Sequence, residues 1–316
     1  MHAATSPRPE IDPLAPLIFI INGASGRQDA EAKGGAIEQV LAAAGRRGEL
    51  RLVPSSRLRR AARLAAADAC SRGTALVGVG GDGTLNAVAQ AAHDAGCVMG
   101  VIPRGTFNYF ARSHGIPEDP AEATAMLLQA HPTPVQVGAI NDKVFLVNAG
   151  IGLFPELLQD REAYKARFGR SRWIAFVSGM ATLMQERRQL RLHIEHGGEV
   201  RDLRTSTLFV GNNRLQLERV GLPEARAIDE GRMAGVMLHA MGTMPMLWLM
   251  LRGAFGMLGE ARTVDSFEFQ RMTVRPWLPL GVPVKVGFDG EVGWMRPPLS
   301  FGVSPRPLYL LKPAPP

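Results

Sequence analysis

The first third of the chain alternates between short apolar runs and longer amphipathic stretches. The apolar runs predict strands at 17–21, 49–53, 75–80 and 97–103, and the stretches predict helices at 36–44, 58–69 and from 85 onward. In the last helix, apolar residues recur at helical spacing. Asp82 or Thr84 is expected to cap its start, and Gly96 follows its end. This alternation predicts an α/β domain with a doubly wound, mostly parallel sheet covered by helices on both faces.

The pattern becomes strand-rich beyond about residue 133. A hairpin is predicted over 190–212 with its turn at Gly197 and Gly198, and helical insertions are predicted at about 155–188 and 244–258. We therefore expect a flexible tail at 1–14, an α/β domain at 15–133 and a mainly β, sandwich-like domain at 134–316. The last segment of the β domain is expected to pack back on the first domain.

Polar or glycine-rich loops follow three of the predicted strands, at 22–26, 80–84 and 103–110. Because ligands bind beyond the carboxyl ends of parallel strands, we expect these loops to open on one crevice. The middle loop matches the dinucleotide pattern G-x-G-x-x-G. That pattern expects an acidic ribose ligand about 20 positions onward, but residues 96–117 contain no Asp or Glu. A plain nicotinamide site is therefore disfavoured, while Arg104 leaves an NADP site open.

The carboxylate of Asp82 lies among these glycines, where an anionic pyrophosphate would bind. A cation is needed between the two, and Mg²⁺ suits the position because it binds one or two protein carboxylates together with phosphate oxygens and water. No Lys follows the glycines as in a Walker A loop, so the metal ion would supply the positive charge. The loop thus predicts a nucleoside triphosphate site.

Composition narrows the choice of partners. The 316 residues carry 36 Lys and Arg against 29 Asp and Glu, a net charge of +7, which favours an anionic partner such as a nucleotide, a nucleic acid or an acidic membrane surface. No recognised nucleic-acid-binding module is found, so no nucleic-acid partner is expected. Cys70 and Cys97 have no metal-ligand spacing, and both are expected to be buried in a reduced, cytoplasmic protein. The most apolar segment, 240–251, is too short to span a bilayer.

Four motifs together resemble the diacylglycerol kinase catalytic family, the bacterial lipid kinases related to sphingosine and ceramide kinases. They are NGASG at 22–26, GGDGTLN at 80–86, PRGTFNYFARSHGIP at 103–117 and FDGE at 288–291. The resemblance implies two domains with ATP bound between them, and transfer of its γ-phosphate, with Mg²⁺, to the hydroxyl of diacylglycerol or a related lipid. It further implies a cytoplasmic enzyme that contacts the inner face of the membrane transiently. A homodimer is left open.

The candidate site residues follow from these motifs and from the needs of phosphoryl transfer. Glu291 is expected to be the general base and Asp82 to hold Mg²⁺, with Glu230 as a second metal contact that the resemblance implies. Asp289 is expected on a strand, pointing to the same face as Glu291. The residues expected to bind the nucleotide are Asn22, Ser25, Gly26, Ser55, Gly80, Gly81, Asp82, Gly83, Thr84, Asn86, Thr106 and Asn108.

Three positions depart from the family pattern. Tyr109 and Gln136 stand where members have acidic residues, and Ala234 replaces the last aspartate of a D-D-G-x-x-D run. These changes concern a structural magnesium network that the resemblance implies. Two other functions therefore stay open: a non-catalytic nucleotide- or lipid-binding protein of the same fold, and an NAD kinase-like enzyme. The arginines within 57–63 are interpreted either as a solvated helix face or as a contact for anionic lipid headgroups.

Overall fold

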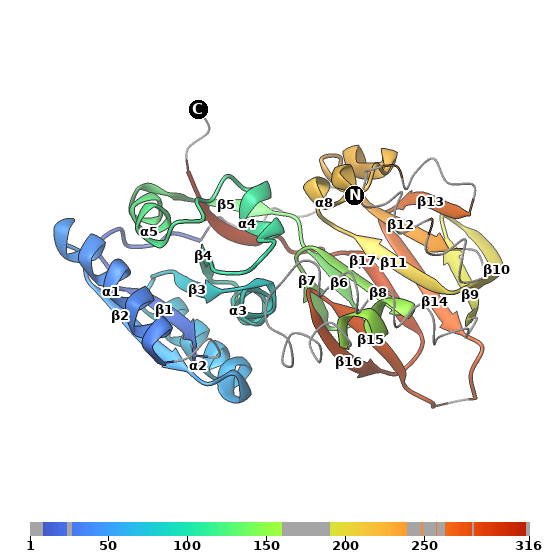
Figure 1. Cartoon of the computed structure of the whole chain (residues 1–316), viewed down its shortest axis with the longest axis horizontal. Coiled ribbons are helices and arrows are strands. Elements are labelled where there is room, and N and C mark those ends of the chain that lie inside the picture. Colours follow the sequence, from blue (N-terminus) through green and yellow to red (C-terminus); the bar gives the residue numbers. More distant parts are fainter. Residues whose placement is uncertain are drawn as a thin grey trace. The chain divides into compact units, whose positions relative to one another are not determined.

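The architecture comes from a computed structural model of the chain. The structure describes residues 9–23, 27–159, 190–238, 248, 257, 263–279 and 281–313, the side chains of 27–33 excepted. It divides into two compact units: unit 1 comprises 1–137 and 304–316, and unit 2 comprises 138–303. Each unit has its own sheets and is described by itself (Figure 1).

Unit 1 is built on a six-stranded sheet with the order β2-β1-β3-β4-β18-β5. Strands β1 to β4 and β18 run parallel to one another, and β5 is antiparallel to β18. Helix α1 packs with α5 and α2 packs with α3, so helices cover both faces (Figure 1). The strands are β1 (Leu17–Asn22), β2 (Gly48–Val53), β3 (Leu76–Gly80), β4 (Val98–Pro103), β5 (His131–Val135) and β18 (Leu308–Lys312); the helices are α1 (Arg27–Ala43), η2 (Ser55–Arg57), α2 (Leu58–Ser71), α3 (Asp82–Ala95), α4 (Tyr109–Ser113) and α5 (Pro120–Gln129). The doubly wound prediction is confirmed.

The central strands of this sheet are continuous apolar runs because they are buried on both faces. All residues of β3 and β4 are buried, and β1 is buried up to its last residue, as expected for parallel strands covered on both faces. Helix α3 starts at Asp82 rather than at the predicted Leu85. It ends where Gly96 adopts the left-handed conformation at φ 71°, as predicted.

The chain leaves unit 1 after Val137 and returns to it at Ser304. The two crossing points lie side by side, because the Ser304 amide donates to the Val137 carbonyl at 2.9 Å. The Ser304 hydroxyl also lies 2.9 Å from Nε2 of His93 on α3, and burial lowers the pKa of this histidine. The returning segment then forms β18, next to β4.

Unit 2 consists of two antiparallel six-stranded sheets, β10-β9-β14-β17-β6-β7 and β13-β12-β11-β8-β15-β16. One core cluster joins them, with Phe145, Phe301 and Leu192 from the first sheet and Ile151 and Phe288 from the second. This arrangement is the predicted β-rich domain. Its elements are β6 (Gly138–Ile140), β7 (Lys143–Phe145), β8 (Asn148–Gly152), β9 (Leu190–His196), β10 (Glu199–Thr205), β11 (Thr207–Gly211), α8 (Arg214–Arg219), η3 (Pro223–Ile228), β12 (Met233–Leu238), β13 (Val264–Phe269), β14 (Arg271–Pro276), β15 (Val284–Phe288), β16 (Glu291–Met295) and β17 (Leu299–Val303).

Several smaller expectations are also decided by the structure. The predicted hairpin is confirmed as β9 and β10, with Gly197 and Gly198 at φ 59° and 82°. Residues 153–159 are helical, but the remainder of the insertion predicted at 155–188, and most of that predicted at 244–258, lie outside the described residues. The expectation of two buried cysteines is wrong for Cys70, which is exposed on α2. Among the helices of the described residues, none has the length and apolar character needed to cross a bilayer.

Candidate functional site

Hydrogen bonds join the loops that follow β1, β2 and β3 in unit 1. The Ser55 hydroxyl donates to Oδ1 of Asn22 at 2.9 Å, and Nδ2 of Asn22 donates to Oγ1 of Thr84 at 2.9 Å. Three residues that sequence reasoning assigned to the nucleotide are thus linked in one chain of side chains. They meet at the carboxyl ends of the parallel strands, where α/β sheets bind their ligands.

The loop after β4 approaches the loop after β3 backbone to backbone. A Cβ placed on Gly81 would lie 3.3 Å from the Cα of Gly105, and one placed on Gly105 would lie 3.1 Å from the Cα of Gly81. Asn108 fixes this approach, because its Oδ1 accepts the Gly105 amide at 2.7 Å while its own backbone adopts φ 48°. Arg104 adds a backbone bond to the Gly80 carbonyl at 2.7 Å. Glycine is therefore required where the two loops touch.

Helix α3 starts at this contact. Gly81 is its N-cap residue and Asp82 its first helical residue, so the prediction that Asp82 or Thr84 caps the helix is wrong. Thr84 is 6% exposed and accepts the Asn22 amide instead. Asn86 is 4% exposed. The partly exposed Asp82 carboxylate at the N-terminus of a 14-residue helix is stabilised by the helix dipole.

An ion-pair cluster positions the loop after β2. Arg51 on β2 pairs with Asp68 of α2 and with Glu49 at 2.8 Å, and Arg72 pairs with Glu49 at 2.6 Å. Hydrogen bonds from the two arginines lower the pKa of Glu49, and the bond from Arg51 lowers that of Asp68. These side chains are between 32% and 43% exposed, so the cluster orients α2 more than it stabilises the unit.

The remaining predicted residues of unit 1 have simpler environments. Thr106 is exposed, Gly80 is the last residue of β3, and Gly83 follows Asp82. A Cβ on Gly80 would lie 2.6 Å from the Cβ of Thr84, so this position also needs glycine. Ser25 and Gly26 lie outside the described residues, and their expected contact with the nucleotide stays a prediction.

In unit 2 the FDGE motif forms a tight hairpin. Asp289 and Gly290 connect β15 to β16 with φ 45° and 86°, as expected for a two-residue turn with an Asp-Gly pair. The Asp289 side chain is 3% exposed, and its carboxylate accepts three backbone amides, from Leu146 at 2.6 Å, Val147 at 2.8 Å and Asn148 at 3.1 Å. The prediction that Asp289 lies on a strand beside Glu291 is therefore wrong. Its carboxylate anchors the turn to the segment before β8.

Glu291 is the first residue of β16 and lies directly opposite Phe288, partly exposed. The anchored turn holds this glutamate at a fixed position in unit 2. Glu230 lies exposed after η3 and pairs with Arg232, which also contacts Glu268 at 2.7 Å. Within the described residues no group of three or more His, Cys, Asp or Glu side chains is arranged to hold a metal ion. The metal contact of Glu230 stays a prediction.

The positions that depart from the family pattern have distinct settings. Tyr109 begins α4, and its ring stacks on Phe107 with centroids 5.6 Å apart. Ala234 is fully buried in β12, where it packs with Leu217 and Leu222. An apolar contact occupies this position instead of an acidic side chain.

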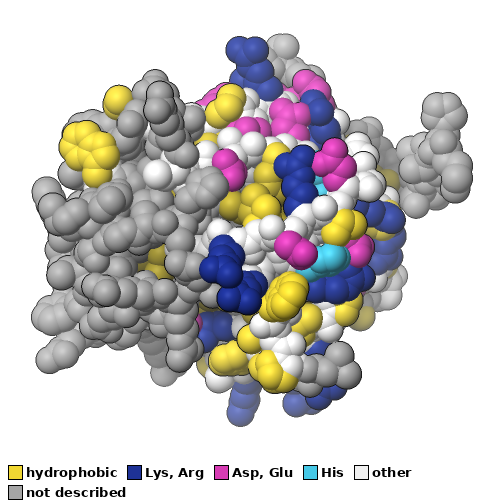
Figure 2. Space-filling model, turned by 90° about the vertical axis from the view of Figure 1, so that its right-hand side faces the viewer, with side chains coloured by type: hydrophobic (Ala, Val, Ile, Leu, Met, Phe, Trp, Pro, Cys, Tyr) yellow, Lys and Arg dark blue, Asp and Glu magenta, His cyan; other side chains and the backbone are white. Residues whose placement is uncertain are grey.

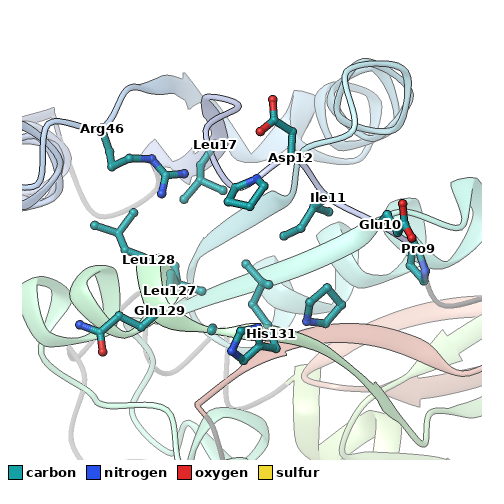
Figure 3. Close-up of a pocket in the computed structure, with 14 residues that line it drawn as sticks. Pro9, Glu10, Ile11, Asp12, Leu17, Arg46, Leu127, Leu128, Gln129 and His131 are labelled. Carbon is teal, nitrogen blue, oxygen red and sulfur yellow. The ribbon is translucent and has the colours of Figure 1, made fainter.

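Two cavities lie away from these loops. One of about 510 Å³ in unit 1 is lined by the segment before β1, Leu17, Arg46 and the end of α5, and Figure 3 shows the Arg46 side chain extending toward Leu17. The other, of about 540 Å³, lies in unit 2 between β9, β10, β12 and β13. On that face of unit 2, Figure 2 shows apolar side chains between charged ones of both signs. Neither cavity is lined by a predicted site residue.

Comparison with known proteins identifies the family. The diacylglycerol kinase catalytic domain family matches residues 16–140. The "Probable lipid kinase YegS-like" of Pseudomonas aeruginosa (strain UCBPP-PA14) is 32% identical over 250 residues, which cover 76% of this chain and 76% of that protein. Its namesake from Klebsiella pneumoniae (strain 342) is 35% identical over 117 residues, which cover 35% of this chain and 39% of the relative. A crystal structure of a diacylglycerol kinase from Bacillus anthracis str. Sterne shares the fold, with a TM-score of 0.66 at 19% identity over 94% of this chain and 96% of that one. The chain therefore belongs to the diacylglycerol kinase catalytic family.

Proposed function

We propose that the protein is an ATP-dependent lipid kinase, which transfers the γ-phosphate of ATP to the hydroxyl of diacylglycerol or a related lipid. Membership of the family supports a lipid kinase. One observation supports the proposed nucleotide site most strongly. The four loops that follow β1, β2, β3 and β4 contact one another at the N-terminus of α3. Because the acceptor is a bilayer lipid, the proposal includes transient contact with the inner face of the membrane.

The phosphates would bind at the start of α3. The first amides of a helix have no carbonyl partner within the helix, so those of Asp82, Gly83 and Thr84 would donate to phosphate oxygens. The bare glycine backbones allow a phosphate to come closer than side chains would permit. The side chains of Ser55 and Thr106 are exposed at the same edge of the sheet and complete the proposed set.

The residues present fit a magnesium ion that is shared with ATP. A carboxylate oxygen is the ligand that Mg²⁺ prefers, and this ion commonly takes one or two protein carboxylates while phosphates and water fill its other positions. Asp82 would hold the ion beside the phosphates. Glu230 is proposed separately, as a contact of the structural magnesium network that the family resemblance implies. No lysine follows the glycine loop, so the bound ion would supply the positive charge there.

Glu291 is proposed as the general base that removes the proton from the attacking lipid hydroxyl. A positioned carboxylate contributes typically about 10²- to 10⁴-fold to such a step. The role needs a fixed side chain, and the three amide bonds to Asp289 supply a rigid turn immediately before Glu291. Asp289 is therefore a positioning residue in this proposal.

The test is transfer of radiolabelled phosphate from ATP, with and without Mg²⁺, to diacylglycerol, monoacylglycerol, sphingoid and phosphatidylglycerol acceptors in mixed micelles. Asp82→Asn and Glu291→Gln are expected to lower turnover by at least about 10²-fold with the fold intact. Asp94→Asn is the matched control, since Asp94 lies exposed at the other end of α3. Wild-type turnover in either site variant would contradict the role given to that residue.

The same assay separates the alternatives. ATP binding without labelled product from any acceptor would favour a non-catalytic binding protein, and labelling of soluble NAD would favour an NAD kinase-like enzyme. Either result would overturn the lipid kinase proposal.

A further inference from the structure

One end of unit 2 exposes several large apolar side chains to water. Trp277 is 64% exposed, Leu278 44% and Val282 39%, all in the loop between β14 and β15, and Trp294 on β16 is 65% exposed. The register places Val282 near Trp294, and Trp277 and Leu278 begin the same loop. Val284, which follows the loop, pairs with Met295, which follows Trp294.

Basic residues surround these apolar side chains. The Trp277 amide donates to the Arg191 carbonyl at 2.8 Å, so Arg191 lies beside the loop. Arg296 is exposed immediately after β16. The ammonium of Lys285 lies 5.7 Å from the Trp294 ring centroid, but it is paired with Glu156 at 2.5 Å and so adds no free charge. Neither the loop 277–283 nor the turn 296–298 contains Asp or Glu. We call Trp277, Leu278, Val282 and Trp294, together with Arg191, Arg204 and Arg296, the tryptophan surface.

Two of these arginines are placed where they repel one another. Arg191 on β9 and Arg204 on β10 are directly opposite in the antiparallel ladder, and both are exposed. Like charges in this position destabilise a sheet. Neither forms an ion pair with a carboxylate in the described part of the chain, so an external anion is the partner that would relieve the repulsion.

We infer that the tryptophan surface docks on an anionic lipid bilayer. The inference rests on the proposed function, because a kinase of bilayer lipids must reach a membrane surface. Exposed apolar side chains that gather at one place, unlike single scattered ones, mark an interaction site. Tryptophan is the residue most suited to the boundary between headgroups and acyl chains, and arginines attract the anionic headgroups. Pro279 and Pro283 limit the freedom of the loop, so less entropy is lost when it docks.

The pictures agree with this placement. Figure 1 shows the connection from β14 to β15 extending from the end of the unit. Figure 2, which labels no residue, shows hydrophobic side chains at the lower edge of the view, with Lys and Arg side chains beside them.

The test is cosedimentation of the full chain with vesicles of phosphatidylcholine alone or mixed with phosphatidylglycerol. Trp277→Ser together with Trp294→Ser is expected to weaken binding to mixed vesicles at least about tenfold. Arg191→Gln together with Arg204→Gln is expected to weaken it about 25-fold, at about fivefold for each charge, and added salt is expected to weaken wild-type binding. Binding to phosphatidylcholine alone should not respond to the arginine pair.

Matched controls come from the same chain. Val200→Ser changes a side chain that is 57% exposed on β10, whose turn to β9 lies at the other end of the hairpin from Arg191 and Arg204. Arg60→Gln together with Arg63→Gln removes two exposed charges from α2 in unit 1. Both controls are expected to bind mixed vesicles within about twofold of wild type. Equal losses in the α2 variant and the Arg191 and Arg204 variant would overturn the surface assignment.

Failure of this inference is distinguishable from failure of the proposed function. Phosphorylation of a short-chain diacylglycerol below its micelle concentration needs no bilayer, so the tryptophan pair variant is expected to retain wild-type turnover on it. Unchanged vesicle binding in that variant would overturn the inference even if the enzyme is a lipid kinase. Wild-type dimers that become monomers in the variant, with vesicle binding unchanged, would instead identify a second copy of the chain as the occupant. If the tryptophan pair variant binds vesicles more weakly but the wild-type protein has no kinase activity, the docking surface is supported and the proposed function is not.

Discussion

The buried carboxylate of Asp289 offers the sharpest test of how the turn before Glu291 is held. Replacing Asp289 with Gly removes the acceptor for the amides of Leu146, Val147 and Asn148, while glycine accepts the φ of 45° without strain. Each buried donor left without a partner costs about 1–3 kcal/mol. Water can reach the turn in the variant, so we expect a loss of about 3–5 kcal/mol in the free energy of unfolding of unit 2.

Asp289→Asn is expected to be intermediate. Its amide oxygen can still accept the Val147 and Asn148 amides, which both bond to Oδ1, but its NH₂ group faces the Leu146 amide that now bonds to Oδ2. The expected loss is about 1–2 kcal/mol, from one unsatisfied donor and the lost charge. Asparagine also tolerates positive φ, so backbone strain does not obscure the comparison.

The assay is unfolding in urea followed by tryptophan fluorescence. All four tryptophans of the chain lie within residues 138–303, so this signal reports on unit 2 alone. Asp202→Asn is the control, since the carboxylate of Asp202 is exposed and, among the described residues, accepts a hydrogen bond only from His193. We expect a change below about 0.5 kcal/mol. If Asp289→Gly unfolds at the same urea concentration as wild type, the three amide bonds do not hold the turn and the reasoning is refuted.

Three further predictions follow from the structure of unit 1. Gly105→Ala is expected to lower the free energy of unfolding by about 1–3 kcal/mol and to weaken ATP binding, because its Cβ would lie 2.8 Å from Oδ1 of Asn108. Gly35→Ala on α1 has free space for its Cβ and should stabilise the protein. Calorimetry and ATP titration check both variants. Burial lowers the pKa of His114 from 6.5 to about 4, so between these pH values only the unfolded chain binds the proton. The free energy of unfolding should therefore decrease by up to about 3 kcal/mol as the pH falls through this range. The melting temperature of His114→Gln should lack this pH dependence. Burial raises the pKa of the Cys97 thiol to about 12, so a thiol reagent should label exposed Cys70 in the native protein and Cys97 only after unfolding; rapid labelling of both would contradict this.

The sequence was sufficient to predict the sheet of unit 1 and the place where its loops meet. Its strands are continuous apolar runs because both faces are buried, and the carboxyl-end rule then places the loops of Asn22, Ser55 and Thr84 at one edge. The exposure of Cys70 was also predictable. The buried residues of α2 run from Leu58 to Ala69 at helical spacing, which leaves position 70 outside.

The role of Asp289 was beyond sequence reasoning for a physical reason. Its hydrogen-bond partners lie more than 140 residues earlier in the chain, and nothing local marks them as partners. The Asp-Gly pair is typical of a two-residue hairpin turn, and on that ground the sequence could have predicted Asp289 in a turn and not on a strand. The predicted cap of α3 was wrong for a similar reason. Thr84 accepts a hydrogen bond from Asn22, and this bond can form only because β1 and β3 are adjacent in the sheet.

The β15–β16 hairpin connects the two proposals and limits how unit 2 can meet a membrane. Glu291 and Trp294 lie on one strand, separated by about 10 Å at the usual rise per residue. If that strand stood upright on the bilayer, a diacylglycerol would have to rise by about this distance to reach Glu291. Lifting roughly eight methylenes in each of two chains into water would cost on the order of 13 kcal/mol, which is more than a surface with two tryptophans can offset. Glu291 and Trp294 are three residues apart, so their side chains point to opposite faces of the sheet. The two proposals are therefore compatible when β16, the last strand of its sheet, lies close to the membrane plane with the sheet edge toward the bilayer. Both side chains then stand at similar depth, and the acceptor hydroxyl stays among the headgroups.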